Sequence, residues 1–171
     1  MTDLKKYIRE IPDFPKKGIG FKDITPLLLS PEACRSVTSG IVAGLKSRKI
    51  DKVVGIESRG FFFGMLLAEK LNAGFVPIRK PGKLPHEIHS QEYALEYGTD
   101  TLEIHKDAIK KGEKVLLHDD VLATGGTARA ACNLVQRLGG EIVQCSFVME
   151  LGFLKGREKL KGFEVKSLIT Y

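Results

Sequence analysis

The segment that most constrains the fold covers residues 115–127, with the sequence VLLHDDVLATGGT. An apolar run typical of a buried strand ends in two carboxylates, a short loop follows, and Thr-Gly-Gly-Thr then begins an amphipathic helix. A strand that leads directly into a helix is the building unit of α/β proteins, in which helices connect parallel strands. We therefore expect functional loops at the carboxyl ends of the strands of such a sheet.

Strand-like and helix-like segments alternate over the rest of the chain. A helix is expected after the start signal Ser30-Pro31-Glu32, because apolar residues recur at helical spacing from Val37 to Leu45. Strands are expected at 51–56, 74–78, 114–118, 141–149 and 163–169, and further helices at 61–71, 127–138 and, weakly, 153–160. The predicted fold class is α/β, with a mostly parallel twisted sheet flanked by helices.

The chain has 171 residues, of which 43% are hydrophobic and 28% charged, so we expect one globular domain over residues 1–171. Two irregular stretches, 11–26 and 79–100, carry aromatic and charged residues rather than the Gly and Ser of a flexible linker, which favours functional loops. The net charge of +6 suits nucleic acid, a membrane surface or an anionic small molecule, and does not choose among them.

Three features of the sequence indicate a cytoplasmic location. No apolar run approaches the ~20 residues that span a bilayer, and residues 1–10 (MTDLKKYIRE) lack the apolar core of a secretory signal. The three cysteines, Cys34, Cys132 and Cys145, have no metal-binding spacing and are expected to be buried thiols of a reducing compartment. We therefore expect a cytoplasmic protein without membrane contact.

The loop that begins the helix after residue 122 has the composition of a phosphate site. Glycines allow the backbone to approach a phosphate, threonine hydroxyls donate to its oxygens, and the start of a helix presents free N–H groups to an anion. Two carboxylates in contact with a phosphate would repel it, so Asp119 and Asp120 are expected to face ribose hydroxyls or the water shell of a metal ion. A capped turn would explain a lone Asp or a lone Gly-Gly, but not the whole run. The expected phosphate-binding residues are Ala123, Thr124, Gly125, Gly126 and Thr127.

Other phosphate and metal motifs fail on spacing. A Walker-type loop needs Gly, four residues and then Gly-Lys-Ser/Thr, whereas Gly40 and Gly44 are followed by Leu45-Lys46-Ser47. The dinucleotide-binding pattern is disfavoured because Asp23 stands where its third glycine would be. The run HEIH at 86–89 is one residue short of the zinc-binding His-Glu-x-x-His arrangement.

Three further segments carry residues suited to anions or a planar base. The turn from Glu57 through Ser58 to Arg59 follows a strand and offers amides and a guanidinium, although an ordinary turn with a surface salt bridge would look the same. Cations gather after the next strand, which suits a multiply charged anion or, equally, a solvated charged surface; they are Arg79, Lys80 and Lys83. Near the N-terminus, Gly20, Phe21 and Lys22 suit stacking on a base, or the anchoring of the segment by Phe21 in the core.

Taken together, these segments resemble one enzyme family. The acidic pair followed by Ala-Thr-Gly-Gly-Thr resembles the phosphoribosyl pyrophosphate (PRPP) motif of type I phosphoribosyltransferases. Five more segments resemble the adenine phosphoribosyltransferases of that family in particular: FPKKGIGFKDITP (14–26), ESRGF (57–61), IRKPGKLP (78–85), LEYG (95–98) and LKGR (154–157). The resemblance covers nearly the whole chain, although some relatives have Asp at position 57, often Arg at 22 and a β-branched residue at 20.

The resemblance implies a role for each segment. Residues 1–30 would form a small hood over the base, which Gly20, Phe21 and Lys22 contact, and residues 79–100 a mobile flap. On that flap, Glu96 would assist proton movement at the purine and Tyr97 would pack over the reaction centre, although sequence alone favours a surface glutamate on a hairpin. The peptide between positions 57 and 58 would be cis. Pyrophosphate would be held by Glu57, Ser58, Arg59, Arg79, Lys80 and Lys83.

The expected reaction is transfer of the 5-phosphoribosyl group from PRPP to adenine, a purine-salvage step that gives AMP and pyrophosphate. Mg²⁺ is implied, bound mainly through the substrate, with Asp119 and Asp120 as contacts through water. The resemblance implies a homodimer, in which some of the cations after the second strand reach the partner subunit. Two alternatives stay open: transfer to a 6-oxopurine, for which Lys22 would be a natural contact, and a non-catalytic PRPP sensor that binds RNA.

Overall fold

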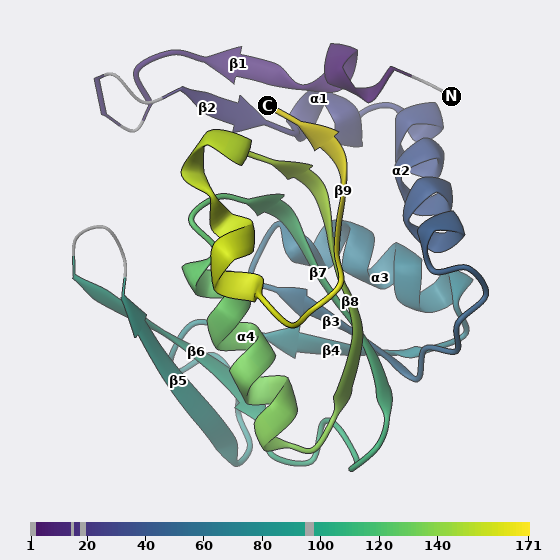
Figure 1. Cartoon of the computed structure of the whole chain (residues 1–171), viewed down its shortest axis with the longest axis vertical. Helices are drawn as coiled ribbons and strands as arrows, with labels where there is room; N and C mark the ends of the chain where they lie inside the picture. Colours follow the sequence, from purple (N-terminus) through teal and green to yellow (C-terminus); the bar gives the residue numbers. More distant parts are fainter. Residues whose placement is uncertain (1–2, 15, 18–19, 95–97) are drawn as a thin grey trace.

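A computed structural model describes residues 3–14, 16–17, 20–94 and 98–171 (Figure 1). Its centre is a five-stranded sheet in the order β4-β3-β7-β8-β9, and every neighbouring pair is parallel. The strands are β3 (Lys52–Ile56), β4 (Gly74–Ile78), β7 (Lys114–Leu122), β8 (Glu141–Glu150) and β9 (Val165–Thr170). The expected parallel α/β sheet is confirmed.

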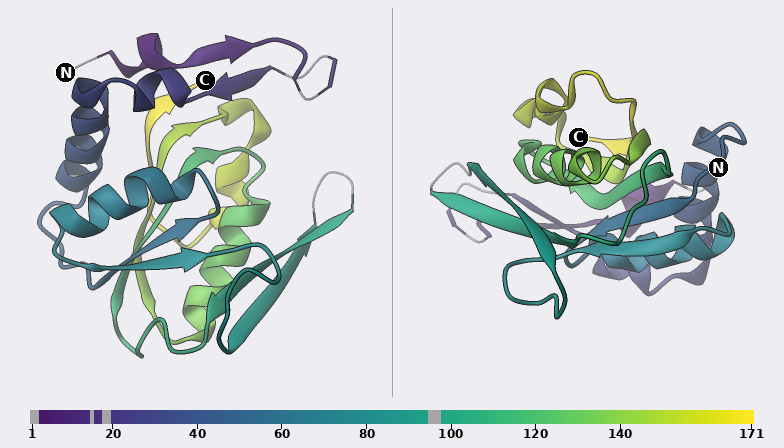
Figure 2. Two further views of the ribbon diagram at one scale, coloured as in Figure 1. Left: turned by 180° about the vertical axis from the view of Figure 1, so that it is seen from behind. Right: turned by 90° about the horizontal axis from the view of Figure 1, so that it is seen from below.

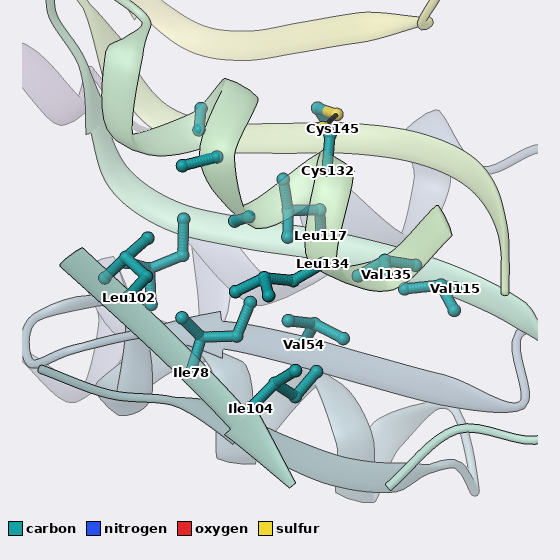
Figure 3. Close-up of a cluster of buried hydrophobic side chains, with 14 of the residues drawn as sticks. Val54, Ile78, Leu102, Ile104, Val115, Leu117, Cys132, Leu134, Val135 and Cys145 are labelled. Carbon is teal, nitrogen blue, oxygen red and sulfur yellow. Dashed lines mark hydrogen bonds between the residues drawn. The ribbon is translucent and has the colours of Figure 1, made fainter. Parts of the chain in front are cut away.

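Helices cover both faces of this sheet, because its strands are apolar on both sides. Alternate residues of one strand point to opposite faces, so Val53 packs with α2 (Pro31–Gly44) and α3 (Gly60–Lys70), whereas Val54 packs with α4 (Gly126–Arg137). Figure 2 shows α3 and α4 on opposite sides of the sheet. The core on the α4 side also takes in Leu102 and Ile104 (Figure 3).

Two antiparallel hairpins flank the central sheet. The first pairs β1 (Arg9–Ile11) with β2 (Phe21–Asp23), close to the C-terminal residue in Figure 1, and is followed by α1 (Thr25–Leu28). The second pairs β5 (Ile88–Ala94) with β6 (Thr99–His105) and packs against α4. The 3-10 helix η1 (Leu4–Tyr7) precedes β1, and η2 (Gly152–Leu154) and η3 (Gly156–Leu160) precede β9.

Three features differ from the sequence prediction. Strand β7 continues beyond 118 to Leu122, because β8 is long enough to pair with it as far as Glu150, so the acidic pair lies within the strand. The weak helix expected at 153–160 is two 3-10 helices, separated by Lys155 at a φ of 54°. No strand was predicted in the first hairpin, and a hairpin was named for the second only as the alternative setting of Glu96. Among the described helices, none has the length and apolar character needed to cross a bilayer.

Candidate active site

A cavity of about 410 Å³ opens at the carboxyl ends of β3 and β7, where the fold predicts a ligand site. It brings together the turn after β3, the end of β7, the start of α4 and the hairpin strand β5. Its lining includes these predicted site residues: Glu57, Ser58, Arg59, Lys80, Asp119, Asp120, Ala123, Thr124, Gly125 and Thr127. It also includes four that were not predicted: Tyr93, Val121, Leu122 and Ala128.

The predicted phosphate-binding loop, residues 123–127 (the phosphate loop below), is shaped by close contact between two backbone segments. Gly125, the residue before α4, has a φ of +79°, and a Cβ there would lie 2.3 Å from the carbonyl oxygen of Gly156. A Cβ on Gly156 would in turn lie 2.2 Å from the carbonyl oxygen of Ala123. No described side chain caps the start of α4, so its first N–H groups are available to an anion at the cavity.

The acidic pair is largely withdrawn from solvent. Asp120 is only 2% exposed, and the amide of Asp120 donates to Asp119 Oδ1 over 2.9 Å. Arg59 Nε lies 3.1 Å from Asp120 Oδ2 as an ion pair, but this buried oxygen accepts no hydrogen bond from the described residues. Burial raises the pKa of both carboxyls, and for Asp119 the neighbouring Asp120 charge adds to this, while Arg59 opposes the rise.

This donor set fits a hard divalent cation in its water shell. Two carboxylates at one point, one of them with an oxygen that lacks a hydrogen bond, suit a cation or a ligand hydroxyl. No group of three or more His, Cys, Asp or Glu side chains among the described residues could hold a metal alone. A cation would therefore take the rest of its ligands from water and substrate.

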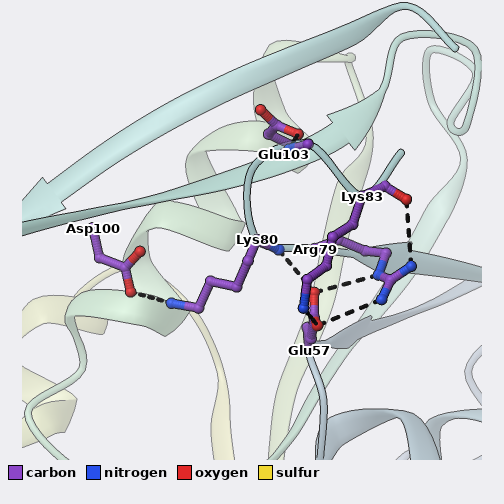
Figure 4. A network of polar contacts seen from close by, with 7 residues as sticks. Glu57, Arg79, Lys80, Lys83, Asp100 and Glu103 are labelled. Carbon is purple, nitrogen blue, oxygen red and sulfur yellow. Dashed lines mark hydrogen bonds and ion pairs between the residues drawn. The ribbon is translucent and has the colours of Figure 1, made fainter. Parts of the chain in front are cut away.

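The turn after β3 contains a cis peptide bond between Glu57 and Ser58, as the resemblance implied. The Glu57 side chain turns towards the cations that follow β4 (Figure 4). It accepts from the Lys80 amide over 2.9 Å and from Arg79 Nε over 3.3 Å, and it pairs with the Lys83 ammonium. Burial alone would raise the pKa of Glu57, but these contacts lower it to about 2.

Each of the four cations expected at the diphosphate is paired with a carboxylate. Figure 4 shows three of these pairs around Glu57 and Asp100. Arg79 and Lys83 share Glu57 and lie outside the cavity lining, whereas Arg59 and Lys80 line it. The four pairs are Arg59–Asp120, Arg79–Glu57, Lys80–Asp100 and Lys83–Glu57. Anion binding here must compete with these internal partners.

The base-binding residues predicted near the N-terminus lie at the edge of this site rather than in its lining. The Phe21 ring lies 5.1 Å from the Arg59 guanidinium and makes an edge-to-face contact with Phe14. The Lys22 ammonium instead pairs with Glu10 over 2.8 Å and lies 4.3 Å from the centre of the Tyr171 ring. Gly20 precedes β2, and Gly126 is the first residue of α4. Glu96 and Tyr97 fall outside the described residues.

Two residues near the cavity were not predicted to act there. Tyr93 links the hairpin to the phosphate loop, because its hydroxyl accepts a hydrogen bond from Thr127 Oγ1 over 3.3 Å. No alternation of apolar residues marks the strand at 88–94 (IHSQEYA), so the sequence carried no signal that would have placed Tyr93 beside this loop. Gly156 supports the phosphate loop from behind, and only the LKGR resemblance pointed to its segment.

Comparison with known proteins places this chain in a family. The phosphoribosyl transferase domain family matches residues 22–167, and the chain belongs to that family. Over 169 residues the chain is 69% identical to the adenine phosphoribosyltransferase of Christiangramia forsetii, with 99% of each covered. The corresponding protein of Thermotoga maritima is 55% identical, with 99% of this chain and 98% of the relative covered.

Solved structures agree with the sequence relatives. The adenine phosphoribosyltransferase of Thermoanaerobacter pseudethanolicus matches with a TM-score of 0.96 and 54% identity, over 99% of this chain and 98% of that one. The Saccharomyces cerevisiae enzyme, complexed with an imino-altritol bisphosphate and adenine, matches with a TM-score of 0.93 and 45% identity, over 97% and 96%. The predicted type I phosphoribosyltransferase fold and the predicted resemblance are confirmed.

Proposed function

We propose that the protein transfers the 5-phosphoribosyl group of PRPP to N9 of adenine, releasing pyrophosphate and forming AMP. This pentosyl transfer is the activity that the sequence predicted, and the names of the relatives confirm it. The observation that carries the proposal is that one cavity joins a phosphate loop, an acidic pair and two of the predicted diphosphate cations.

The phosphate loop would hold the 5′-phosphate of PRPP. Its amides at the start of α4 and the hydroxyls of Thr124 and Thr127 would donate to the phosphate, and the αL conformation of Gly125 permits close approach. The Thr127 hydroxyl, which donates to Tyr93 Oη in this structure, would turn to the phosphate. Ala123 and Gly126 complete this loop. A fixed phosphate leaves the ribose within reach of β7, which contributes Asp119 and Asp120 to the same cavity.

The acidic pair would face the ribose hydroxyls. The half-buried carboxylate of Asp119 and the buried one of Asp120 would accept hydrogen bonds from the 2′- and 3′-hydroxyls directly, or hold the water shell of Mg²⁺ bound to the substrate. Bound Mg²⁺ would supply charge neutralisation at the diphosphate. The acidic pair, in the same cavity as the phosphate loop, fixes the ribose between the two ends of PRPP.

The leaving group would be held by Arg59 and Lys80, with Arg79 and Lys83 behind them. As the bond from C1 to the diphosphate oxygen breaks, positive charge develops on the ribose and negative charge on the diphosphate. Adenine N9 then forms the new bond to C1, and the N9 proton leaves. Glu96 is proposed to accept that proton, and Tyr97, on the flap at 79–100, to exclude water.

Adenine would bind between the N-terminal hood, residues 1–30, and the end of β7. Phe21 offers a ring face beside Arg59, while Gly20 and Lys22 would contact the base through their backbone, since the Lys22 side chain is paired with Glu10. This pairing favours adenine over a 6-oxopurine, for which a free lysine would be the natural contact.

A homodimer in the cytoplasm completes the proposal. One face of α3 exposes Phe62, Met65 and Leu66, at 48%, 52% and 45%. Residues spaced by three and four form one stripe on a helix, and an exposed apolar stripe is typical of a subunit interface. The unpaired thiols fit a reducing compartment. Light scattering should give twice the mass of one chain, and Met65→Glu should reduce it.

One assay tests the proposed activity. Purified protein is incubated with PRPP, Mg²⁺ and each purine base separately, and nucleotide formation is followed. We expect AMP from adenine and no nucleotide from hypoxanthine, guanine or xanthine. Product from a 6-oxopurine only would overturn the base assignment, and no product from any base would favour the non-catalytic sensor.

A further inference from the structure

The Lys80 ammonium is held by residues of the β5–β6 hairpin. It pairs with the Asp100 carboxylate and donates to Tyr93 Oη over 3.3 Å (Figure 4 shows the pair). Tyr93 Oη donates to Asp100 Oδ2 over 3.2 Å, and the two residues are directly opposite each other in the hairpin register. Thr127 Oγ1 completes the chain by donating to Tyr93 Oη.

Asp100 differs from the other two carboxylates that hold the site's cations. Glu57, in the turn after β3, and Asp120, in β7, both line the cavity. Asp100 comes from β6 and does not line it. Burial works against ionisation of Asp100, yet contacts with Lys80 and the Thr101 amide hold its pKa below the ordinary value. Asp100 is therefore a permanent counter-ion of Lys80 at neutral pH.

We propose that Asp100 sets the affinity of the site for PRPP by competing with the diphosphate for the Lys80 ammonium. The inference rests on the proposed function, because it takes the diphosphate to bind at Lys80. Lys80 lines the cavity while its ammonium pairs with Asp100, so a diphosphate oxygen bound by that ammonium must replace or share the carboxylate.

Substitution by asparagine separates charge from geometry. In Asp100→Asn an oxygen in place of Oδ2 still accepts from Tyr93 and Lys80 and the negative charge is removed, at the cost of the hydrogen bond that the Thr101 amide donates to Oδ1. The pair is partly exposed, at 36% for Lys80 and 28% for Asp100, so the competition is moderate. PRPP should bind the asparagine variant about fivefold more tightly. Asp100→Glu, which restores the charge, should bind PRPP like the unchanged protein.

The matched control is Glu87→Gln. Glu87 pairs with Lys106 over 3.0 Å at the ends of the same hairpin, so this variant loses one hairpin carboxylate at a position away from the cavity lining. Affinities are measured by calorimetry with PRPP and Mg²⁺ in the absence of adenine. Ribose 5-phosphate, which lacks the diphosphate, is titrated as a second probe and should bind all variants alike.

A double-mutant cycle tests whether Asp100 acts through Lys80. In a Lys80→Met background, Asp100→Asn should change PRPP affinity by less than about twofold. The inference is overturned if Asp100→Asn binds PRPP no more tightly, if Glu87→Gln tightens binding equally, or if the gain persists without Lys80. If the unchanged protein fails to bind PRPP at all, the proposed function falls with it.

Discussion

Replacing Gly156 by alanine should damage the phosphate loop without altering any residue that lines the cavity. A Cβ on Gly156 would lie 2.2 Å from the carbonyl oxygen of Ala123 and 3.1 Å from the amide nitrogen of Gly125. Because the nearer atom belongs to the backbone, no side chain can rotate to relieve the contact. The loop must move by about 1 Å or more to reach van der Waals separation.

The expected loss of activity exceeds the loss of stability. Overpacking of this kind costs about 1–3 kcal/mol. For a chain of this length each kcal/mol lowers Tm by about 2–4 °C, so Tm should fall by no more than about 12 °C. A misplacement of about 1 Å in a substrate-binding group lowers turnover about 100-fold, and we expect that loss in kcat/KM for PRPP.

Initial rates of AMP formation and thermal melts followed by circular dichroism check this prediction. Gly44→Ala is the matched control, because Gly44 ends α2 and a Cβ there meets nothing within 4 Å. It should leave kcat/KM unchanged. If folded Gly156→Ala keeps kcat/KM for PRPP within threefold of the unchanged protein, the contact with Gly156 does not set the geometry of the loop.

Three more variants have definite expected outcomes. Folding lowers the Glu57 pKa from 4.5 to about 2, so the ionised side chain stabilises the fold above pH 4.5 and this effect is lost towards pH 2. The difference in Tm between the unchanged protein and Glu57→Gln should shrink as the pH falls over that range. Burial lowers the His118 pKa from 6.5 to about 4, so the folded state loses stability relative to the unfolded state as the pH falls from 6.5 to 4. His118→Val should therefore make Tm depend less on pH over that range. Asp119→Asn combined with Asp120→Asn should lower kcat about 100-fold or more while the circular dichroism spectrum is kept, and an unchanged kcat would exclude their catalytic role.

The sequence predicted the central sheet well because its strands are apolar on both faces. Runs such as Val53 with Val54 and Leu116 with Leu117 are buried on opposite sides, and this continuous burial is what distinguishes a parallel sheet between two helical layers. The last residues of β7 were not predicted as strand, because they include the acidic pair, which is typical of a loop. Only pairing with β8 as far as Glu150 keeps these residues in a strand.

The strands of the β5–β6 hairpin were not predicted, for a different reason. Strand β5 (IHSQEYA) has no fully buried residue, and its residues 89–92 (HSQE) are polar, so no apolar pattern marks it as a strand. Its place is set by β6, whose Leu102 and Ile104 enter the core beneath α4. Tyr93 contacts the phosphate loop because β5 is paired with β6 and β6 is packed against the core.

The site's cations could be predicted from sequence, but their partners could not. Residue type and position after a strand pointed to Arg59 and Lys80, whereas the carboxylates opposite them come from β7 and β6. Cations crowded into one cavity repel one another when it is empty, and Glu57, Asp100 and Asp120 relieve that repulsion. The same carboxylates then oppose the anionic substrate. Stability of the empty site and affinity for PRPP are therefore set against each other, and Asp100, which lies outside the cavity lining, is where the balance can be altered without removing a cavity residue.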